Sequence, residues 1–113
     1  MHELALSQGI IDVVCRQAAA DGASRVLRVR IAVGALSHVE PNAIEFCFDA
    51  VSRGTLADGA RLEIDRPAGR AHCLACESVV DVAGYDSPCP ACGAHRWVLV
   101  GGDELRVLEL EVA

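Results

Sequence analysis

The 113-residue sequence predicts an α+β protein in which two helices pack on a three-stranded mixed sheet, with a four-cysteine domain inserted into that unit. Helix-like and strand-like apolar periodicities alternate as α-β-α-β up to residue 67. Two C-x2-C pairs follow, and a last strand-like run comes after them. Because two strands are marginal without a third, we expect the last residues to complete the first sheet. The first domain is therefore predicted to comprise residues 1–67 plus 108–113, and the inserted domain residues 68–107.

The first two elements are predicted by a change in the apolar period. Apolar side chains at helical spacing predict a helix over residues 4–20. The side chains expected on its apolar face are Leu4, Ile11, Val14, Cys15 and Ala18. Asp21-Gly22 then gives a stop signal. From Val26 to Val33 apolar residues alternate with two arginines and an alanine, which is typical of a half-buried strand.

The next pair of elements begins at Pro41, a residue well suited to the first position of a helix. The stripe that follows predicts a helix over about residues 41–53, ending near Gly54: Ile44, Cys47, Phe48 and Val51. Arg61 to Arg66 alternates again, and Pro67 closes this run as a short strand.

The inserted domain has three short strand-like runs, around residues 70–72, 78–82 and 96–100. About forty residues with few large hydrophobic side chains cannot bury a core of their own. Metal binding must therefore supply much of the folding free energy of this domain. We interpret it as zinc-ribbon-like.

The last run, residues 104–112, changes parity in its middle. Leu105 and Val107 share one strand face, whereas the next apolar residues share the other: Leu108, Leu110 and Val112. Such a change indicates either a β-bulge or one long strand that passes from the inserted domain into a different sheet. We favour the second explanation, because the first sheet needs a third strand.

The six cysteines divide into four and two by their spacing. The four in C-x2-C pairs can close a tetrahedral thiolate site: Cys73, Cys76, Cys89 and Cys92. Four protein ligands leave no open position for water or substrate, so the metal would be structural. Zn(II) is the default metal, iron is an alternative because one pair resembles a rubredoxin knuckle, and local disulfides or free thiols are a further alternative. Cys15 and Cys47 stand alone in apolar stretches, and we expect both in the core.

Two histidines, His72 and His95, flank the cysteine pairs. Each could bind the metal, donate a hydrogen bond to a thiolate, or lie on the surface. Since four cysteines already suffice for a closed site, we favour the last two roles.

Charge and composition exclude several classes of function. The formal net charge is −6, with ten arginines and no lysine against sixteen acidic residues, which disfavours nucleic acid as a partner. Residues 68–107 alone hold three arginines against five acids. No apolar stretch approaches the ~20 residues of a membrane span, and the N-terminus does not have the pattern of a secretory signal, so we expect no membrane partner and a cytoplasmic location.

An enzyme is not expected, because the sequence has no phosphate loop, no nucleophile beside an evident base and no metal cluster with an open position. A zinc-ribbon module that binds a protein or a nucleic acid is an alternative function for a domain of this kind.

The N-terminal residues Met1, His2 and Glu3 have a specific capacity for metal binding. A free α-amine, the following backbone nitrogens and the imidazole of residue two can form fused chelate rings in one plane. Tetragonal nitrogen ligation of this kind suits Ni(II) or Cu(II) rather than Zn(II). Because His2 is large, we expect the initiator methionine to be retained.

Five segments together resemble the HypA/HybF family of hydrogenase maturation proteins, and the resemblance covers essentially the whole chain. In addition to the two C-x2-C pairs they are Met1-His2-Glu3-Leu4-Ala5-Leu6-Ser7-Gln8, Arg28-Val29-Arg30-Ile31-Ala32-Val33-Gly34-Ala35-Leu36-Ser37, Val39-Glu40-Pro41, Gly54-Thr55 and Gly102-Asp103-Glu104-Leu105. Their order and spacing, taken jointly, are highly specific.

The resemblance implies a nickel metallochaperone that inserts Ni(II) into the large subunit of [NiFe]-hydrogenase together with the GTPase HypB. It implies a nickel domain of two helices on a three-stranded sheet, beside a zinc domain whose ligands fall on the four cysteines named above. Nickel, the transient cargo, would bind through the Met1 amine, the His2 imidazole and the backbone nitrogens of His2 and Glu3. His38 is interpreted as a loop histidine. Some relatives also serve urease, and the chain is expected to be a monomer or a homodimer.

Overall fold

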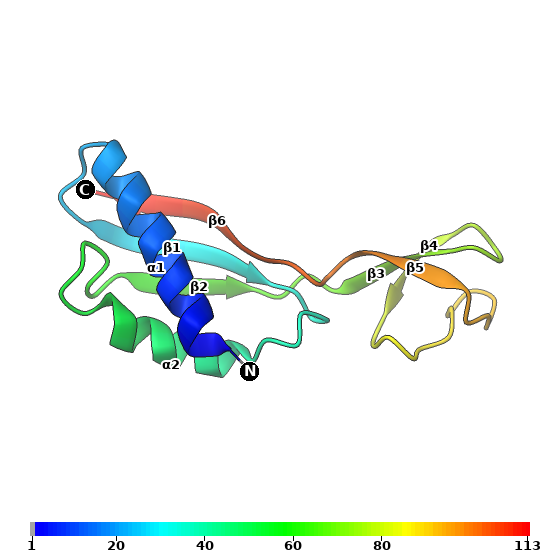
Figure 1. Ribbon diagram of the computed structural model, residues 1–113. Coiled ribbons are helices and arrows are strands. Elements are labelled where there is room, and N and C mark those ends of the chain that lie inside the picture. The colour runs from blue at the N-terminus through cyan, green and yellow to red at the C-terminus, as the bar shows by residue number, and fades with distance from the viewer. Residues whose placement is uncertain (1) are drawn as a thin grey trace.

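A computed structural model describes residues 2–113 and contains two helices and six strands (Figure 1). In chain order these are α1 (Glu3–Ala20), β1 (Val26–Val33), α2 (Pro41–Ser52), β2 (Arg61–Asp65), β3 (Gly69–Cys73), β4 (Val79–Val82), β5 (Trp97–Gly101) and β6 (Leu105–Val112). The predicted order of elements is confirmed, and every predicted boundary lies within two residues of the observed one.

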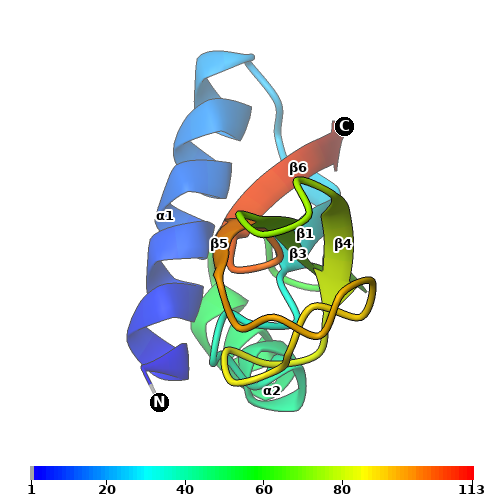
Figure 2. The same cartoon turned by 90° about the vertical axis from the view of Figure 1, so that its right-hand side faces the viewer.

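The first sheet has the strand order β2-β1-β6. β1 and β2 are parallel and are joined through α2, whereas β1 and β6 are antiparallel, so the sheet is mixed. Both helices cover the same face of this sheet; α1 crosses it, and α2 lies along the edge formed by β2 (Figures 1 and 2). The predicted α+β class is therefore confirmed.

The main core lies between the helices and this sheet. Its central residues are Ile10, Ile11, Val14, Ala18, Val26, Val29, Ile31, Val33, Ile44, Phe48 and Ala57. The expected inward position of Leu4 is wrong. Leu4 is 60% exposed, and the first fully buried position of α1 is Ser7, which donates a hydrogen bond to the carbonyl of Ile44.

The lone cysteines do not behave alike. Cys15 is half-buried and packs against the main core, whereas Cys47 is half-buried and lies outside it. The expected core position of Cys47 is wrong because the buried line of α2 runs through Ile44, Phe48 and Ser52 at spacings of four, which turns Cys47 to the flank.

The change of parity in the last strand is a bulge. β6 pairs with β1 along its whole length, from Leu105 opposite Val33 to Val112 opposite Val26, and the register shifts where Val107 and Glu109 face consecutive residues of β1. The extra residue, Leu108, is 36% exposed. The preference for a strand that changes sheets is therefore wrong: the bulge returns the following apolar residues to the core face.

The helix-free face of the first sheet carries a network of ion pairs. Arg28 contacts Glu63 at 2.7 Å and Glu109 at 3.0 Å, across both neighbouring strands. Arg30 repeats the pattern with Asp65 and Glu109. Exposed ion pairs contribute little stability individually. We therefore interpret the main role of this network as keeping the open face of the sheet polar.

The second sheet has the order β4-β3-β5, and both pairings are antiparallel. Its buried core is small: Leu36, Ala71 and Val82, with Val80, Trp97 and Leu99 packed beside them. The two sheets follow each other along the molecule, which measures 52 × 26 × 16 Å (Figure 1). Its radius of gyration is 17.1 Å, against about 13 Å for a compact chain of this length.

The two sheets are joined by a hydrogen-bonded junction in which three chain segments cross. The N–H groups of residues 34, 35 and 36 donate to the carbonyls of Glu104 at 2.8 Å, Pro67 at 2.9 Å and Gly102 at 2.7 Å. The division into domains at residues 67/68 and 107/108 stays a prediction; β6, which pairs with β1, begins at Leu105, three residues before residue 108. Among residues 2–113, no helix is long and apolar enough to cross a membrane.

Replacing Gly34 should test how tightly this junction is packed. A Cβ at residue 34 would lie 2.2 Å from the carbonyl oxygen of Gly102, so both backbones would have to move. We expect Gly34→Ala to lower the free energy of unfolding by about 2–4 kcal/mol in urea denaturation. The matched control is Gly9→Ala in α1, where nothing lies within 4 Å of the new Cβ; it should raise stability by about 0.5–1 kcal/mol. Equal effects of the two substitutions would contradict a close-packed junction.

Candidate metal centre

Two similar turns present the four cysteines of the C-x2-C pairs. In the first, at the end of β3, the N–H of Glu77 donates to the carbonyl of Cys73 at 2.9 Å. In the second, the N–H of Gly93 donates to the carbonyl of Cys89 at 2.7 Å. Each turn is thus closed by a bond from the fifth residue to the first, which places both sulfurs of a pair on the same side.

Both turns require a left-handed backbone at the residue after the second cysteine. Gly93 has φ 77°, and Glu77 has φ 60° at the equivalent position of the first turn. Glycine adopts this conformation without steric cost, whereas a side chain with a Cβ does so only under constraint. In the second turn the glycine at residue 93 indicates this left-handed conformation in the sequence. In the first turn the equivalent residue is Glu77, which gives no such indication.

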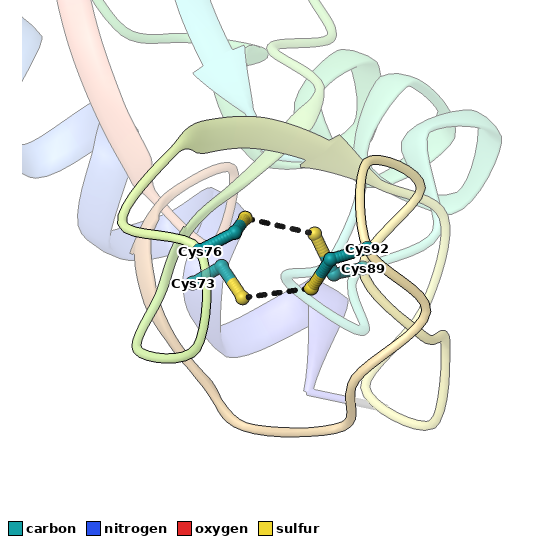
Figure 3. A group of neighbouring side chains, drawn as sticks. All are labelled: Cys73, Cys76, Cys89 and Cys92. Atoms are coloured by element: carbon teal, nitrogen blue, oxygen red, sulfur yellow. Dashed lines mark hydrogen bonds between the residues drawn. The ribbon is translucent and has the colours of Figure 1, made fainter.

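The four sulfurs converge on one point between the turns (Figure 3). The Sγ atoms of Cys73 and Cys92 are 3.7 Å apart, and those of Cys76 and Cys89 are 3.8 Å apart. All four lie within 4.8 Å of one another, and all six cysteines of the chain are free. Tetrahedral Zn–S bonds of about 2.3 Å require sulfurs about 3.8 Å apart, which the two distances of 3.7 and 3.8 Å match, so the cluster is of the size that a zinc ion needs.

The local surroundings shift the pKa values of Cys76 and Cys92 in opposite directions. The hydroxyl and N–H of Ser78 lower the pKa of Cys76 to about 6. At Cys92 the N–H of Ala94 favours the thiolate, but burial and the neighbouring sulfurs raise the pKa to about 11. Like charges this close cannot all ionise without a cation. A divalent metal supplies the missing positive charge and displaces the remaining protons, so its affinity should rise with pH.

The flanking histidines are outside the sulfur cluster. Among residues 2–113, the group of side chains able to hold a metal contains the four cysteines and neither His72 nor His95. His72 is half-buried in β3 and precedes Cys73, so its side chain points to the opposite strand face. His95 is exposed. A hydrogen bond from either histidine to a thiolate stays a prediction.

Two of the three residues predicted to bind nickel lie at the start of α1. Met1 is outside the described residues, His2 is exposed just ahead of the helix, and Glu3 is its first residue. The Glu3 carboxylate accepts a hydrogen bond from the N–H of Glu40 at 3.2 Å, which ties the start of α1 to the start of α2. Among residues 2–113, the start of α1 is not part of a group of three or more metal-binding side chains, and the nickel site stays a prediction.

A contact between the two sheets was not foreseen from the sequence. The Tyr85 hydroxyl donates to the carbonyl of Leu36 at 3.1 Å, and the Tyr85 ring stacks on His38. A lone tyrosine in a loop has no periodicity and no motif, and only the fold brings it to residues almost fifty positions earlier.

The fold and the sulfur cluster together define a small two-sheet metal-binding protein with a closed, structural type of thiolate site. The family model described as hydrogenase/urease nickel incorporation, metallochaperone, HypA matches residues 1–112. The chain belongs to this HypA family, whose members are nickel metallochaperones of hydrogenase maturation.

Relatives and solved structures agree with this assignment. Hydrogenase maturation factor HypA is 47% identical in Rhizobium leguminosarum bv. viciae and 50% identical in Geobacter metallireducens, in both cases over 112 residues and 99% of each chain. The solution structure of the Ni metallochaperone HypA from Helicobacter pylori has a TM-score of 0.71 at 24% identity, covering 99% of this chain and 97% of that one. Another HypA solution structure has a TM-score of 0.74 at 23% identity, covering 100% and 97%. Both structural likenesses support the fold.

Metal analysis of cysteine variants should test the division of the cysteines into four and two. The wild-type protein should carry about one zinc per chain and show no visible absorption, since Zn(II) is d¹⁰. Cys92→Ser should lose most of this zinc, because three thiolates no longer close the shell. The control Cys47→Ser, at a half-buried site outside the core, should keep it. Zinc retained in Cys92→Ser, or a coloured iron protein, would contradict this assignment.

Proposed function

We propose that this chain binds Ni(II) at its N-terminus and delivers it to the large subunit of [NiFe]-hydrogenase, with a structural zinc ion at the four cysteines. The observation that carries the proposal is the match of a nickel-incorporation family over residues 1–112, in a chain whose second residue is histidine. Zinc and nickel then occupy separate sites with different chemistry.

The proposed nickel ligands are the Met1 amine, the His2 imidazole and the backbone nitrogens of His2 and Glu3. The N–H groups of the first helical turn take no part in the i to i−4 ladder of a helix, so metal binding by these backbone nitrogens would break no ladder bond of α1. The partial positive charge at a helix N-terminus also stabilises an amide nitrogen that has lost its proton to the metal. The exposure of His2 supports direct access for the ion and for a receiving protein.

The ligand type fits a protein that must give up its metal. Nitrogen ligands in a tetragonal arrangement suit Ni(II) or Cu(II) rather than Zn(II), and an exposed terminus allows stepwise exchange. The four thiolates form a closed cage, which suits a metal that stays. Nickel is therefore the cargo, and zinc is a permanent part of the fold.

The partners follow from what the chain lacks. Its sequence has no nucleotide-binding motif, so the energy for directed transfer would come from a HypB-type GTPase. We expect the exchange to take place in the cytoplasm, where reducing conditions keep the thiols available for zinc. Urease as a second recipient, and a monomer or homodimer, are both compatible with this function.

Calorimetry with nickel should test the terminal site in the zinc-loaded protein. We expect about one Ni(II) per chain, and a loss of affinity of about tenfold or more when a residue is added before Met1 or when His2 is replaced by alanine. The added residue removes the α-amine from the chelate, and the substitution removes the imidazole. His95→Ala removes an exposed histidine in the other sheet's domain and should bind nickel like the wild type. If the extended protein binds as tightly as the native one, the terminal-amine site is wrong.

A further inference from the structure

The loop between β4 and the second cysteine pair contacts the segment that joins β1 to α2. Within it, Tyr85 donates its hydroxyl hydrogen bond to Leu36 and stacks its ring on His38, with centroids 5.4 Å apart and planes 14° from parallel. A cleft of about 420 Å³ lies at this contact, lined in part by Glu40. One aromatic side chain therefore links the zinc-binding part of the chain to the loop ahead of α2.

His38 is held in a strained conformation at this contact. Its φ is 61°, in the left-handed region that a residue with a Cβ rarely adopts. Such a conformation persists where the surroundings hold it. On the N-terminal side a turn closes from Ser37 to Gly34, and on the other side the ring of His38 rests on Tyr85. Loss of the stack removes one of the constraints on residues 38–40.

Two residues further on, Glu40 connects the loop to both helices. Its N–H donates to the Glu3 carboxylate at 3.2 Å, and its own carboxylate accepts from the N–H of Asn42 at 3.1 Å, capping α2. Glu3 directly follows His2. The segment 36–40 is thus anchored by Tyr85 at one end and reaches the start of α1 at the other.

Tyr85 in turn depends on the metal-binding turns. It lies between Cys76 and Cys89 in a loop without regular secondary structure, and the indole N–H of Trp97 holds the same loop through the carbonyl of Ser87 at 2.8 Å. β4, which pairs with β3, holds the start of this loop, and a closed sulfur site would fix its end at Cys89.

We propose that Tyr85 is a positioning residue for the nickel-binding terminus: through its contacts with Leu36 and His38 it holds the loop whose Glu40 N–H binds Glu3. The assignment rests on the proposed function, because it concerns the terminal nickel site. It gives the zinc domain a second task besides folding, which is to hold the segment against which the terminus is placed.

Amide NMR and nickel calorimetry on the zinc-loaded full chain test this role. We expect Tyr85→Ala to shift the amide resonances of Glu3 and Glu40 in the nickel-free protein and to speed hydrogen exchange at the Glu40 N–H. We also expect nickel affinity to fall by about fivefold or more. Tyr85→Phe keeps the stack and should show a smaller effect. His38→Ala removes the stack from outside the zinc domain and should reproduce the effect of Tyr85→Ala on the Glu40 amide.

The matched control is Val100→Ala, an exposed position of β5 away from this contact. Zinc content and the emission of Trp97, the sole tryptophan, should stay native in every variant that is compared. If Tyr85→Ala and His38→Ala leave the Glu3 and Glu40 amides as Val100→Ala does, Tyr85 has no positioning role. That readout contains no nickel, so a failure of nickel to bind at the terminus would overturn the proposed function and not this contact.

Discussion

Four sulfur atoms within 4.8 Å of one another form the constraint on which the second half of the molecule depends. The buried core of that half comprises Leu36, Ala71 and Val82, which is too small to hold three short strands. A metal ion held by the four cysteines would replace the missing core by fixing two turns at once. The left-handed residues Glu77 and Gly93 show that the backbone is bent to meet this geometry.

The junction carries this constraint into the first half of the molecule. Leu36 belongs to the small second core, and its N–H and carbonyl bind Gly102 and Tyr85. The same segment continues through His38 to Glu40, the residue that caps α2 and binds Glu3. The two halves of the elongated molecule are therefore not joined by a single flexible linker. Three backbone segments and one aromatic stack connect them.

The sequence predicted those features that depend on local periodicity or fixed spacing. The alternation from Val26 to Val33 matches β1 at both ends, Pro41 begins α2 as expected, and the doubled C-x2-C spacing identifies the sulfur cluster. Features that depend on tertiary packing could not be predicted from the sequence. The parity change near Leu108 fits a bulge and a change of sheet equally well until the strand partner is known. Cys47 lies at the flank because the whole fold sets the rotation of α2 about its axis. His38 stacks on Tyr85 because the whole fold sets the path of both loops.

Hydrogen exchange, measured residue by residue with zinc bound and after chelation, tests most directly whether the metal holds the second sheet. The account predicts that the amides of β3, β4 and β5 lose their protection when zinc is removed, while those of β1 and β6 keep it, since the core between the helices and the first sheet contains no metal ligand. Protection of β3 to β5 that survives chelation would contradict the central role of the sulfur site.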